Sequence, residues 1–214
     1  MTNGDLSKRA QVDTRTVAWT AVAPGVDEKT LEDCGLEQGE TELRRTSLVR
    51  LAPGASTVFG RKGCVDILVV EGELATHPAG TYIHEPAGVA RDTRGGCTAI
   101  VKVRPSRSRV RTVVDTRAVT YEPSHTLGLW SAPLHEDPDG RVVLLRFDPG
   151  TAIGPHHHED GEEFFVLQGE LVDDFGRYSA SAWVRQPPGS LHRVTSERGC
   201  LLLTFAHHLH DVRG

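Results

Sequence analysis

Short runs of apolar residues, separated by Gly, Pro and Asp, follow one another along most of the chain. LVRLA (48–52), DILVVEGEL (66–74) and TAIVKV (98–103) are typical, and they are rich in Val, Ile and Leu. Runs of this length and composition, bounded by turn-forming residues, predict β-strands. A 3.6-residue periodicity is discernible only around DEKTLEDCG (27–35), so we expect helix to be a minor component. The pattern predicts an all-β fold.

The chain contains the same unit twice. Four pairs of segments match in order along the chain: LVRLAPG (48–54) with LLRFDPG (144–150), LVVEGEL (68–74) with FVLQGEL (165–171), EPAGVAR (85–91) with QPPGSLH (186–192), and RGGC (94–97) with ERGC (197–200). The offset between matched positions rises from 96 at Gly54 and Gly150 to 103 at Cys97 and Cys200, which small insertions in the second copy explain. Such a repeat predicts two copies of one structural unit.

The repeat therefore predicts two β-barrels or sandwiches of roughly 90 residues each. The polar, basic stretch VRPSRSRVR (103–111) lies between them and is interpreted as a solvated linker rather than a binding patch. The predicted boundaries are an N-terminal tail at 1–18, a first domain at 19–104, a linker at 105–111 and a second domain at 112–214.

Composition and charge argue against some classes of binding partner. The chain has 24 basic and 29 acidic residues, a net charge of −5, which disfavours nucleic acid because nucleic-acid-binding surfaces are markedly basic. No run approaches the roughly 18 apolar residues of a membrane-spanning helix, and the first residues lack the apolar core of a signal peptide. We therefore expect a cytoplasmic protein that binds neither membrane nor nucleic acid. The four cysteines form no CxxC pair and are expected to be buried thiols.

Metal-ligand chemistry is concentrated in GTAIGPHHHEDGEEFFVLQGE (150–170). Side chains alternate along a strand, so His156 and His158 share one face and His157 points to the other. The EDG segment predicts a turn that brings Glu162 back beside the histidine pair, and His192 follows a Pro/Gly turn further on. Three imidazoles and a carboxylate suit one divalent transition metal such as Zn or Fe, with Mn, Co, Ni and Cu as alternatives.

These residues resemble the two motifs of the cupin family. The first, G-x5-H-x-H-x3/4-E-x6-G, is matched at every spacing by Gly150, His156, His158, Glu162 and Gly169. The second, G-x5-P-x-G-x2-H-x3-N, is matched by Pro187, Gly189 and His192, whereas Ser181 and Ser196 replace its first Gly and last Asn. The resemblance implies two tandem jelly-roll barrels, a bicupin, with His156, His158, Glu162 and His192 as the metal ligands.

Within the cupins, DDFGRYSASAWVRQPPGSLHRVTSERGC (173–200) with the later AHHL looks like the ChrR-like group. That group includes the cupin domain of ChrR-type anti-sigma factors and relatives of dihydroxyacetophenone dioxygenase. The resemblance is strong over 129–210 and weak over 19–104. It implies an Fe(II)-dependent dioxygenase-type enzyme for a small carbonyl or hydroxyketone compound. The alternatives are a zinc-binding sensor module without catalysis and a metal-assisted cyclase or isomerase.

The first copy keeps the glycine and proline frame of the motifs but loses every histidine. Gly60 and Lys62 stand at the two histidine positions, Val65 or Asp66 replaces the glutamate, and Arg91 takes the last ligand position. The first copy is therefore predicted to bind no metal. Its cations leave two interpretations open: an anion site, or ion pairing in a barrel that no longer has a ligand.

Further residues are candidates for roles around the ion. Glu163, Tyr178, Arg185 and His208 are predicted to support the ligands or transfer protons, and Glu163 is expected to face outward. Phe164, Val166 and Trp183 are candidates for an apolar wall, with ordinary core packing as the alternative. The tail before the first copy has no cysteine or histidine, unlike the zinc domain of ChrR-type anti-sigma factors, so direct sigma-factor binding is not expected. A small molecule is the expected partner, and a homodimer through strand edges stays open.

Overall fold

The computed structural model describes residues 2–35, 44–59, 63–86 and 88–209. It divides into unit 1, which comprises Met1–Asp5 and Val17–Val119, and unit 2, which comprises Leu6–Thr16 and Thr120–Gly214. Within the described residues the secondary structure is β, apart from one 3₁₀ turn at Thr14–Thr16. The all-β prediction is confirmed. None of the helical structure in the described residues has the length and apolar character that a membrane crossing requires.

Unit 1 is built on a sheet with the strand order β11-β8-β6-β10-β4-β3-β2, to which β7 adds by pairing with β6, and on the separate pair β5-β9. Its strands are β2 (Thr20–Ala23), β3 (Val26–Asp33), β4 (Arg45–Leu51), β5 (Ser56–Phe59), β6 (Cys64–Leu74), β7 (His77–Pro78), β8 (Thr81–Glu85), β9 (Val89–Asp92), β10 (Cys97–Arg104) and β11 (Thr112–Asp115).

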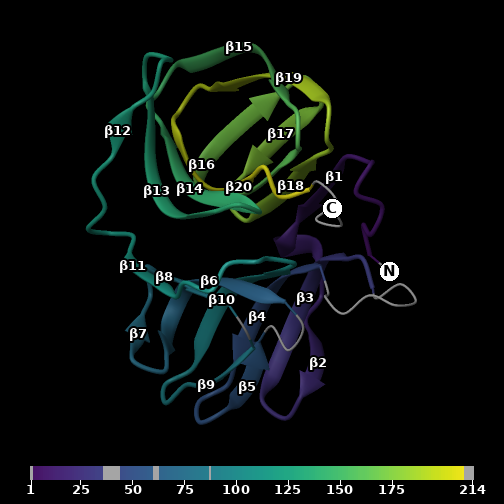
Figure 1. Cartoon of the computed structure of the whole chain (residues 1–214), viewed down its shortest axis with the longest axis vertical. Helices are drawn as coiled ribbons and strands as arrows, with labels where there is room; N and C mark the ends of the chain where they lie inside the picture. The colour runs from purple at the N-terminus through teal and green to yellow at the C-terminus, as the bar shows by residue number, and fades with distance from the viewer. Residues whose placement is uncertain (1, 36–43, 60–62, 87, 210–214) are drawn as a thin grey trace. The chain divides into compact units, whose positions relative to one another are not determined.

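Unit 2 has the order β1-β18-β16-β20-β14-β13-β12, with β17 on β16 and with β19 paired to both β15 and β16. Its strands are β1 (Ala10–Asp13), β12 (Glu122–Pro123), β13 (Leu129–Asp137), β14 (Gly140–Phe147), β15 (Thr151–His158), β16 (Glu162–Asp173), β17 (Gly176–Ser179), β18 (Ala182–Gln186), β19 (Ser190–Ser196) and β20 (Cys200–Ala206). In Figure 1 these strands form a ring, with β15 and β19 across from β18 and β20.

The strand orders of the two units correspond element by element, so the predicted repeat is a repeat of structure. The Gly-Glu-Leu segments at 72–74 and 169–171 show why the two copies fold alike. Gly72 and Gly169 both have φ near +70°, and a Cβ on either would lie 2.0 Å from a backbone oxygen, that of Gly96 or Gly199. Only glycine fits a left-handed residue with such a close backbone neighbour. Each glycine lies beside a β-bulge in the pairing of β6 with β10 or of β16 with β20.

Each unit has its own apolar core inside the barrel. In unit 1 the core includes Val49, Ile67 and Ile83, and in unit 2 it includes Phe164 and Val184. The core positions alternate with residues on the other face of their strands, as a closed sheet requires.

The structural units differ from the predicted boundaries at two short strands. β1 lies in the segment predicted to be a tail, but it pairs with β18 of unit 2. β11 lies in the predicted second domain, but it pairs with β8 of unit 1. Each strand has only four residues, too few for a clear hydrophobic pattern. Residues 105–111, predicted to be the linker, have no regular secondary structure.

The weak helical periodicity at 27–35 corresponds to a strand, not a helix, because β3 covers Val26–Asp33. A bulge between Thr30 and Glu32 interrupts its pairing with β4, so the period of two is lost. Glu32 and its neighbour Leu31 are both buried. The Glu32 carboxylate lies 3.5 Å from the buried Lys102 ammonium, which explains a charged residue inside.

None of the four cysteines forms a disulfide bond. Three of them are buried as predicted, whereas Cys34 is half-buried. Burial raises the pKa of Cys97 and of Cys200, which occupy equivalent positions in the repeat, to about 11. These thiols are therefore protonated and act as small apolar core residues.

Candidate metal centre

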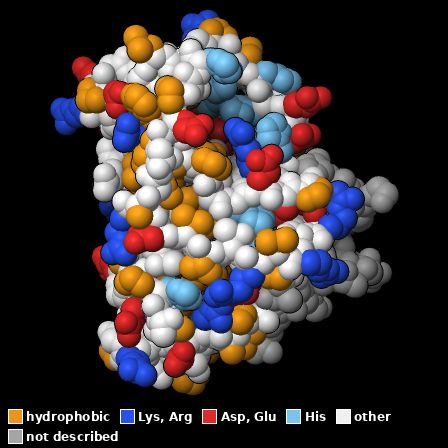
Figure 2. All heavy atoms as spheres, turned by 60° about the vertical axis from the view of Figure 1, so that its left-hand side comes forward, with side chains coloured by type: hydrophobic (Ala, Val, Ile, Leu, Met, Phe, Trp, Pro, Cys, Tyr) orange, Lys and Arg blue, Asp and Glu red, His pale blue; other side chains and the backbone are white. Residues whose placement is uncertain are grey.

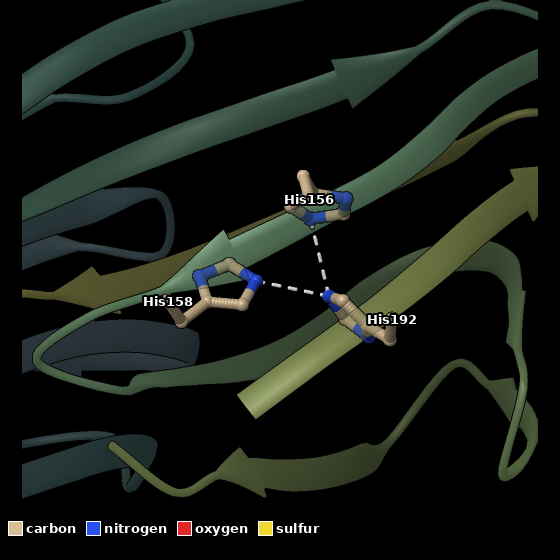
Figure 3. A group of neighbouring side chains, drawn as sticks. All are labelled: His156, His158 and His192. Carbon is tan, nitrogen blue, oxygen red and sulfur yellow. Dashed lines mark hydrogen bonds between the residues drawn. The ribbon is translucent and has the colours of Figure 1, made fainter. Parts of the chain in front are cut away.

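Three histidines converge on the paired strands β15 and β19 of unit 2. His156 and His158 lie near the end of β15, and His192 lies in β19, directly opposite His156 in the antiparallel pairing. His157 alternates to the other face and is exposed. Figure 3 shows the three rings turned toward one another from the two strands.

The distances between the ring nitrogens fit a shared ion. His192 Nε2 lies 2.9 Å from His158 Nε2 and 3.1 Å from His156 Nε2. Two nitrogens that bind one ion at about 2.0–2.1 Å, with an angle near 90° between the bonds, lie about 3 Å apart. All three residues offer donor atoms within 4.8 Å of one another. The donor set therefore suits a divalent transition metal.

The environment of His156 and His158 favours the neutral imidazole, which is the state that binds a metal. Burial, and then the neighbouring His192 and His156, lower the pKa of His158 to about 3. Burial also lowers the pKa of His156. His192 Nε2 lies at hydrogen-bond distance from both neighbouring Nε2 atoms, and a bound cation would take the place of the proton that such a contact needs.

Glu162, the first residue of β16, lies at the edge of this group. Its Oε2 is 3.6 Å from His158 Nε2, and it lies outside the set of three residues whose donor atoms all fall within 4.8 Å. Burial raises the pKa of Glu162 to about 7, with the Arg141 charge acting in the opposite direction. Glu162 is therefore close to the histidines, and its role as the fourth ligand stays a prediction.

His192 is oriented from behind by two residues that the sequence did not single out. Its Nδ1 lies 3.2 Å from Asp173 Oδ2 and 3.0 Å from Gln186 Nε2. Burial raises the pKa of Asp173, but hydrogen bonds from His192, Tyr178 and the backbone hold the net value at about 2. An ionised carboxylate only accepts hydrogen bonds, so it favours the proton on Nδ1 and leaves Nε2 free for a metal.

The four residues predicted to act around the ion separate into two groups. Tyr178 is in the barrel core, and its hydroxyl donates to Asp173 Oδ1 at 2.7 Å. Asp173 in turn contacts His192, so Tyr178 is linked to that histidine through Asp173. Glu163 and Arg185 alternate with inward-facing residues of their strands and so face the other side of the sheet. His208 Nε2 lies 3.4 Å from Glu163 Oε2 there, and all three are buried. This placement makes Glu163, Arg185 and His208 a buried polar cluster away from the histidines.

The apolar candidates separate in the same way. Phe164 and Val166 belong to the barrel core. Trp183 lies between the inward-facing Ala182 and Val184, so it packs on the opposite face and does not line the site.

The corresponding place in unit 1 is occupied by ion pairs. Arg91, at the position of His192, pairs with Glu85, and Arg111 donates to the same Glu85 oxygen at 2.7 Å. Gly60 and Lys62 lie outside the described residues. The observed ion pair of Arg91 therefore supports the interpretation that the cations of the first copy are used in ion pairing.

Asp66 instead belongs to a buried network of unit 1. It accepts hydrogen bonds from Tyr82, His84 and Arg104 at 2.6–3.0 Å. Burial opposes ionisation of Asp66, but Arg104 and the hydrogen bonds outweigh it and hold its pKa far below the usual value. Cys64, Asp66 and His84 also lie within 4.8 Å of one another. Because the carboxylate is already neutralised by the guanidinium, this cluster is a structural ion-pair network.

Two barrels of one design define a bicupin, and among the described residues it is unit 2 that brings three imidazoles together. The sequence comparison agrees with this class: a family profile described as ChrR Cupin-like domain matches residues 7–107 and again 109–210. The chain belongs to the ChrR cupin-like domain family. No curated protein matched it in a sequence search.

Solved structures with the same fold have diverse names. A candidate dioxygenase from Nostoc punctiforme has a TM-score of 0.73 at 16% identity, with 97% of this chain and 85% of that one covered. Oxalate decarboxylase from Bacillus subtilis has a TM-score of 0.62 at 12% identity, covering 92% and 76%. The 7S globulin of Momordica charantia has a TM-score of 0.62 at 10% identity, covering 94% and 85%. At these identities the likeness shows the fold alone.

Proposed function

We propose that unit 2 binds one divalent transition-metal ion through His156, His158 and His192, with Glu162 as the fourth ligand. We further propose that the protein is an Fe(II)-dependent dioxygenase-type enzyme for a small carbonyl or hydroxyketone compound. The observation that carries the proposal is the approach of three Nε2 atoms, at 2.9 and 3.1 Å, from the paired strands β15 and β19.

Accessibility matters because a substrate must reach the ion. His156 and His158 are half-buried rather than enclosed. Figure 2 shows a group of histidine side chains at the surface of unit 2, with acidic side chains beside them. A metal that prefers five or six ligands would keep open positions with this donor set, whereas a structural zinc site is closed.

Bound there, iron(II) supplies the capacity to react with dioxygen, as in non-haem iron oxygenases that use histidine and carboxylate ligands. The proposed overall reaction cleaves the bond between the carbonyl and hydroxyl carbons of a hydroxyketone. Both atoms of dioxygen enter the two carboxylic acid products, so no external reductant is needed. The name of the Nostoc punctiforme neighbour is consistent with oxygen chemistry on this fold.

The chain's own residues have distinct parts in this proposal. The imidazoles hold the ion, and Asp173 with Gln186 fixes the orientation of His192. The buried Phe164 and Val166 fill the barrel interior behind the ligands and exclude water from that side. The four free thiols are consistent with a reducing compartment, and a cytoplasmic location is part of the proposal.

The test is metal analysis joined to oxygen uptake. Protein purified without air is loaded with Fe(II) or Zn(II), the metal per chain is measured, and oxygen consumption is followed with a panel of hydroxyacetophenones and diketones. We expect one metal per chain and oxygen uptake with the iron form only. His157→Ala is the matched control, because the same substitution on the outward face should leave both readouts unchanged.

Two outcomes would favour the alternatives. A protein that retains zinc and consumes no oxygen with any compound would support a sensor module, and one that converts a carbonyl compound without oxygen would support a cyclase or isomerase. Either result would overturn the dioxygenase proposal while leaving the metal site intact. A wild-type chain that binds no metal would overturn both parts.

A further inference from the structure

The N-terminal segment supplies a residue to the surroundings of the metal centre. Residues 7–16 fall within the first family match, yet they belong structurally to unit 2. β1 pairs with β18 from Ala10 opposite Arg185 to Asp13 opposite Ala182. Arg9 immediately precedes β1, so this pairing places it beside Gln186 at the end of β18.

Arg9 makes a dense set of polar contacts there. Its guanidinium donates to Gln186 Oε1 at 2.7 Å and to Asp173 Oδ2 at 3.1 Å, and it also contacts the Tyr178 hydroxyl. The guanidinium stacks over the Phe175 ring at 4.3 Å from its centroid. The Arg9 side chain is 19% exposed and that of Asp173 is fully buried.

Two of the three acceptors of Arg9, Asp173 and Gln186, also contact His192. Asp173 Oδ2 accepts from Gln186 Nε2 at 2.9 Å, and the same oxygen lies 3.2 Å from His192 Nδ1. The bond from Arg9 to Gln186 Oε1 also fixes the amide orientation, which turns Nε2 toward Asp173 Oδ2. A chain of hydrogen bonds thus runs from Arg9 to the imidazole without a gap.

We propose that Arg9 is a positioning residue for the metal centre: through Asp173, which it contacts directly and by way of Gln186, it fixes the ring orientation and tautomer of His192. The inference rests on the proposed metal-binding function and extends it, because it makes the metal affinity of the second repeat depend on a residue of the first family match.

Unit 1 supports the assignment independently. Arg111 precedes β11 just as Arg9 precedes β1, and it donates to Glu85, the counterpart of Gln186. Glu85 in turn pairs with Arg91, the counterpart of His192. In both units, therefore, an arginine contacts the last residue of the neighbouring strand, and that residue contacts the side chain at the last ligand position. Only in unit 2 does it end on an imidazole.

The experiment measures Co(II) affinity of the full chain by chelator competition, together with the visible absorption spectrum of bound Co(II). Removing groups that orient metal-bound histidines typically weakens binding by about 10–100-fold. We expect a loss of this order for Asp173→Asn and for Arg9→Met, and a smaller loss for Arg9→Lys, which keeps the charge but not the planar fork. Arg15→Met is the control, since Arg15 lies in the same segment but is exposed and pairs only with Asp13 among the described residues.

The double variant Arg9→Met with Asp173→Asn separates positioning from general support. If Arg9 acts through Asp173, the double variant binds Co(II) about as well as Asp173→Asn alone, and both shift the Co(II) spectrum. A role in folding alone would lower the melting temperature of the metal-free protein without changing the spectrum, and that result would overturn the proposal. Arg9→Gln provides a second variant if Arg9→Met does not fold.

Different results would overturn the proposed metal site and the positioning role of Arg9. Wild-type protein that binds no Co(II) would overturn the proposed metal site, and this inference with it. Wild-type protein that binds Co(II), loses it with His158→Ala and retains full affinity with Arg9→Met would overturn the positioning role alone.

Discussion

Replacing adjacent histidines of β15 one at a time tests the geometry of the metal centre. His158→Ala removes one imidazole whose Nε2 lies 2.9 Å from that of His192. His157→Ala makes the same chemical change one residue away, on the exposed face opposite Leu191. Because the two variants carry the same substitution on the same strand, a difference in their metal affinity reports the direction in which each side chain points.

The expected magnitude follows from the number of ligands. Structural zinc sites with four ligands bind with about 10–16 kcal/mol, which is about 2.5–4 kcal/mol for each ligand. At 1.4 kcal/mol per factor of ten, the loss of His158 should weaken binding roughly 10²–10³-fold. His157→Ala should change the dissociation constant by less than about twofold, since its side chain is on the solvent side of the strand.

The assay is competition of Zn(II) or Co(II) between the protein and a chelator of known affinity, with the melting temperature of each metal-free variant as a check on folding. Equal losses for the two variants would refute the alternation of β15 and with it the assigned ligand set. A loss for His157→Ala alone would mean that the bulge between Ile153 and His156 shifts the strand phase by one residue.

The remaining predictions concern the frame of the two barrels. Asp66→Asn should lower the free energy of unfolding in denaturant titrations at pH 7 by about 3–5 kcal/mol, because it removes the charge of a carboxylate that pairs with the buried Arg104. The pKa of Asp66 is depressed in the folded protein, so its stabilisation is present above the unfolded value of about 3.9 and declines below it; the gap between wild type and variant should therefore narrow in acid. Gly169→Ala should cost about 2–5 kcal/mol from left-handed strain and backbone overlap, against about 1–2 for Gly150→Ala, which has φ +82° and nothing within 4 Å. Arg91→His should add no second metal per chain in metal analysis, because the first copy still lacks two imidazoles and a carboxylate.

The sequence was sufficient for the repeat, the fold class and the meeting of three histidines. These features depend on local rules: alternation in a strand places His156 and His158 together, and the matched motifs place His192 beside them. Glycines at equivalent turn positions of the two copies also indicate the repeat, since a backbone with φ near +70° accepts few other residues.

The parts that could not be predicted depend on pairing between distant segments. β1 is too short to show a pattern, and its place beside β18 follows only from the folded chain. One signal was available: AQVDTRT (10–16) resembles TVVDTRA (112–118), which extends the repeat to the two strands in question. No such signal marks Asp173, whose contact with His192 spans 19 residues. The face of Arg185 and Trp183 likewise depends on the register of β18.

The comparison of the two units separates what the fold needs from what the metal centre provides. Unit 1 reaches the same strand order with an arginine at the last ligand position and no histidine at the others. Its strands are held by a buried apolar core and by the Asp66 and Glu85 ion pairs. Unit 2 has an apolar core of the same kind, so its barrel does not depend on an ion either. The convergence of three imidazoles in unit 2 is therefore not explained by the needs of the barrel, and it supports the proposed metal site.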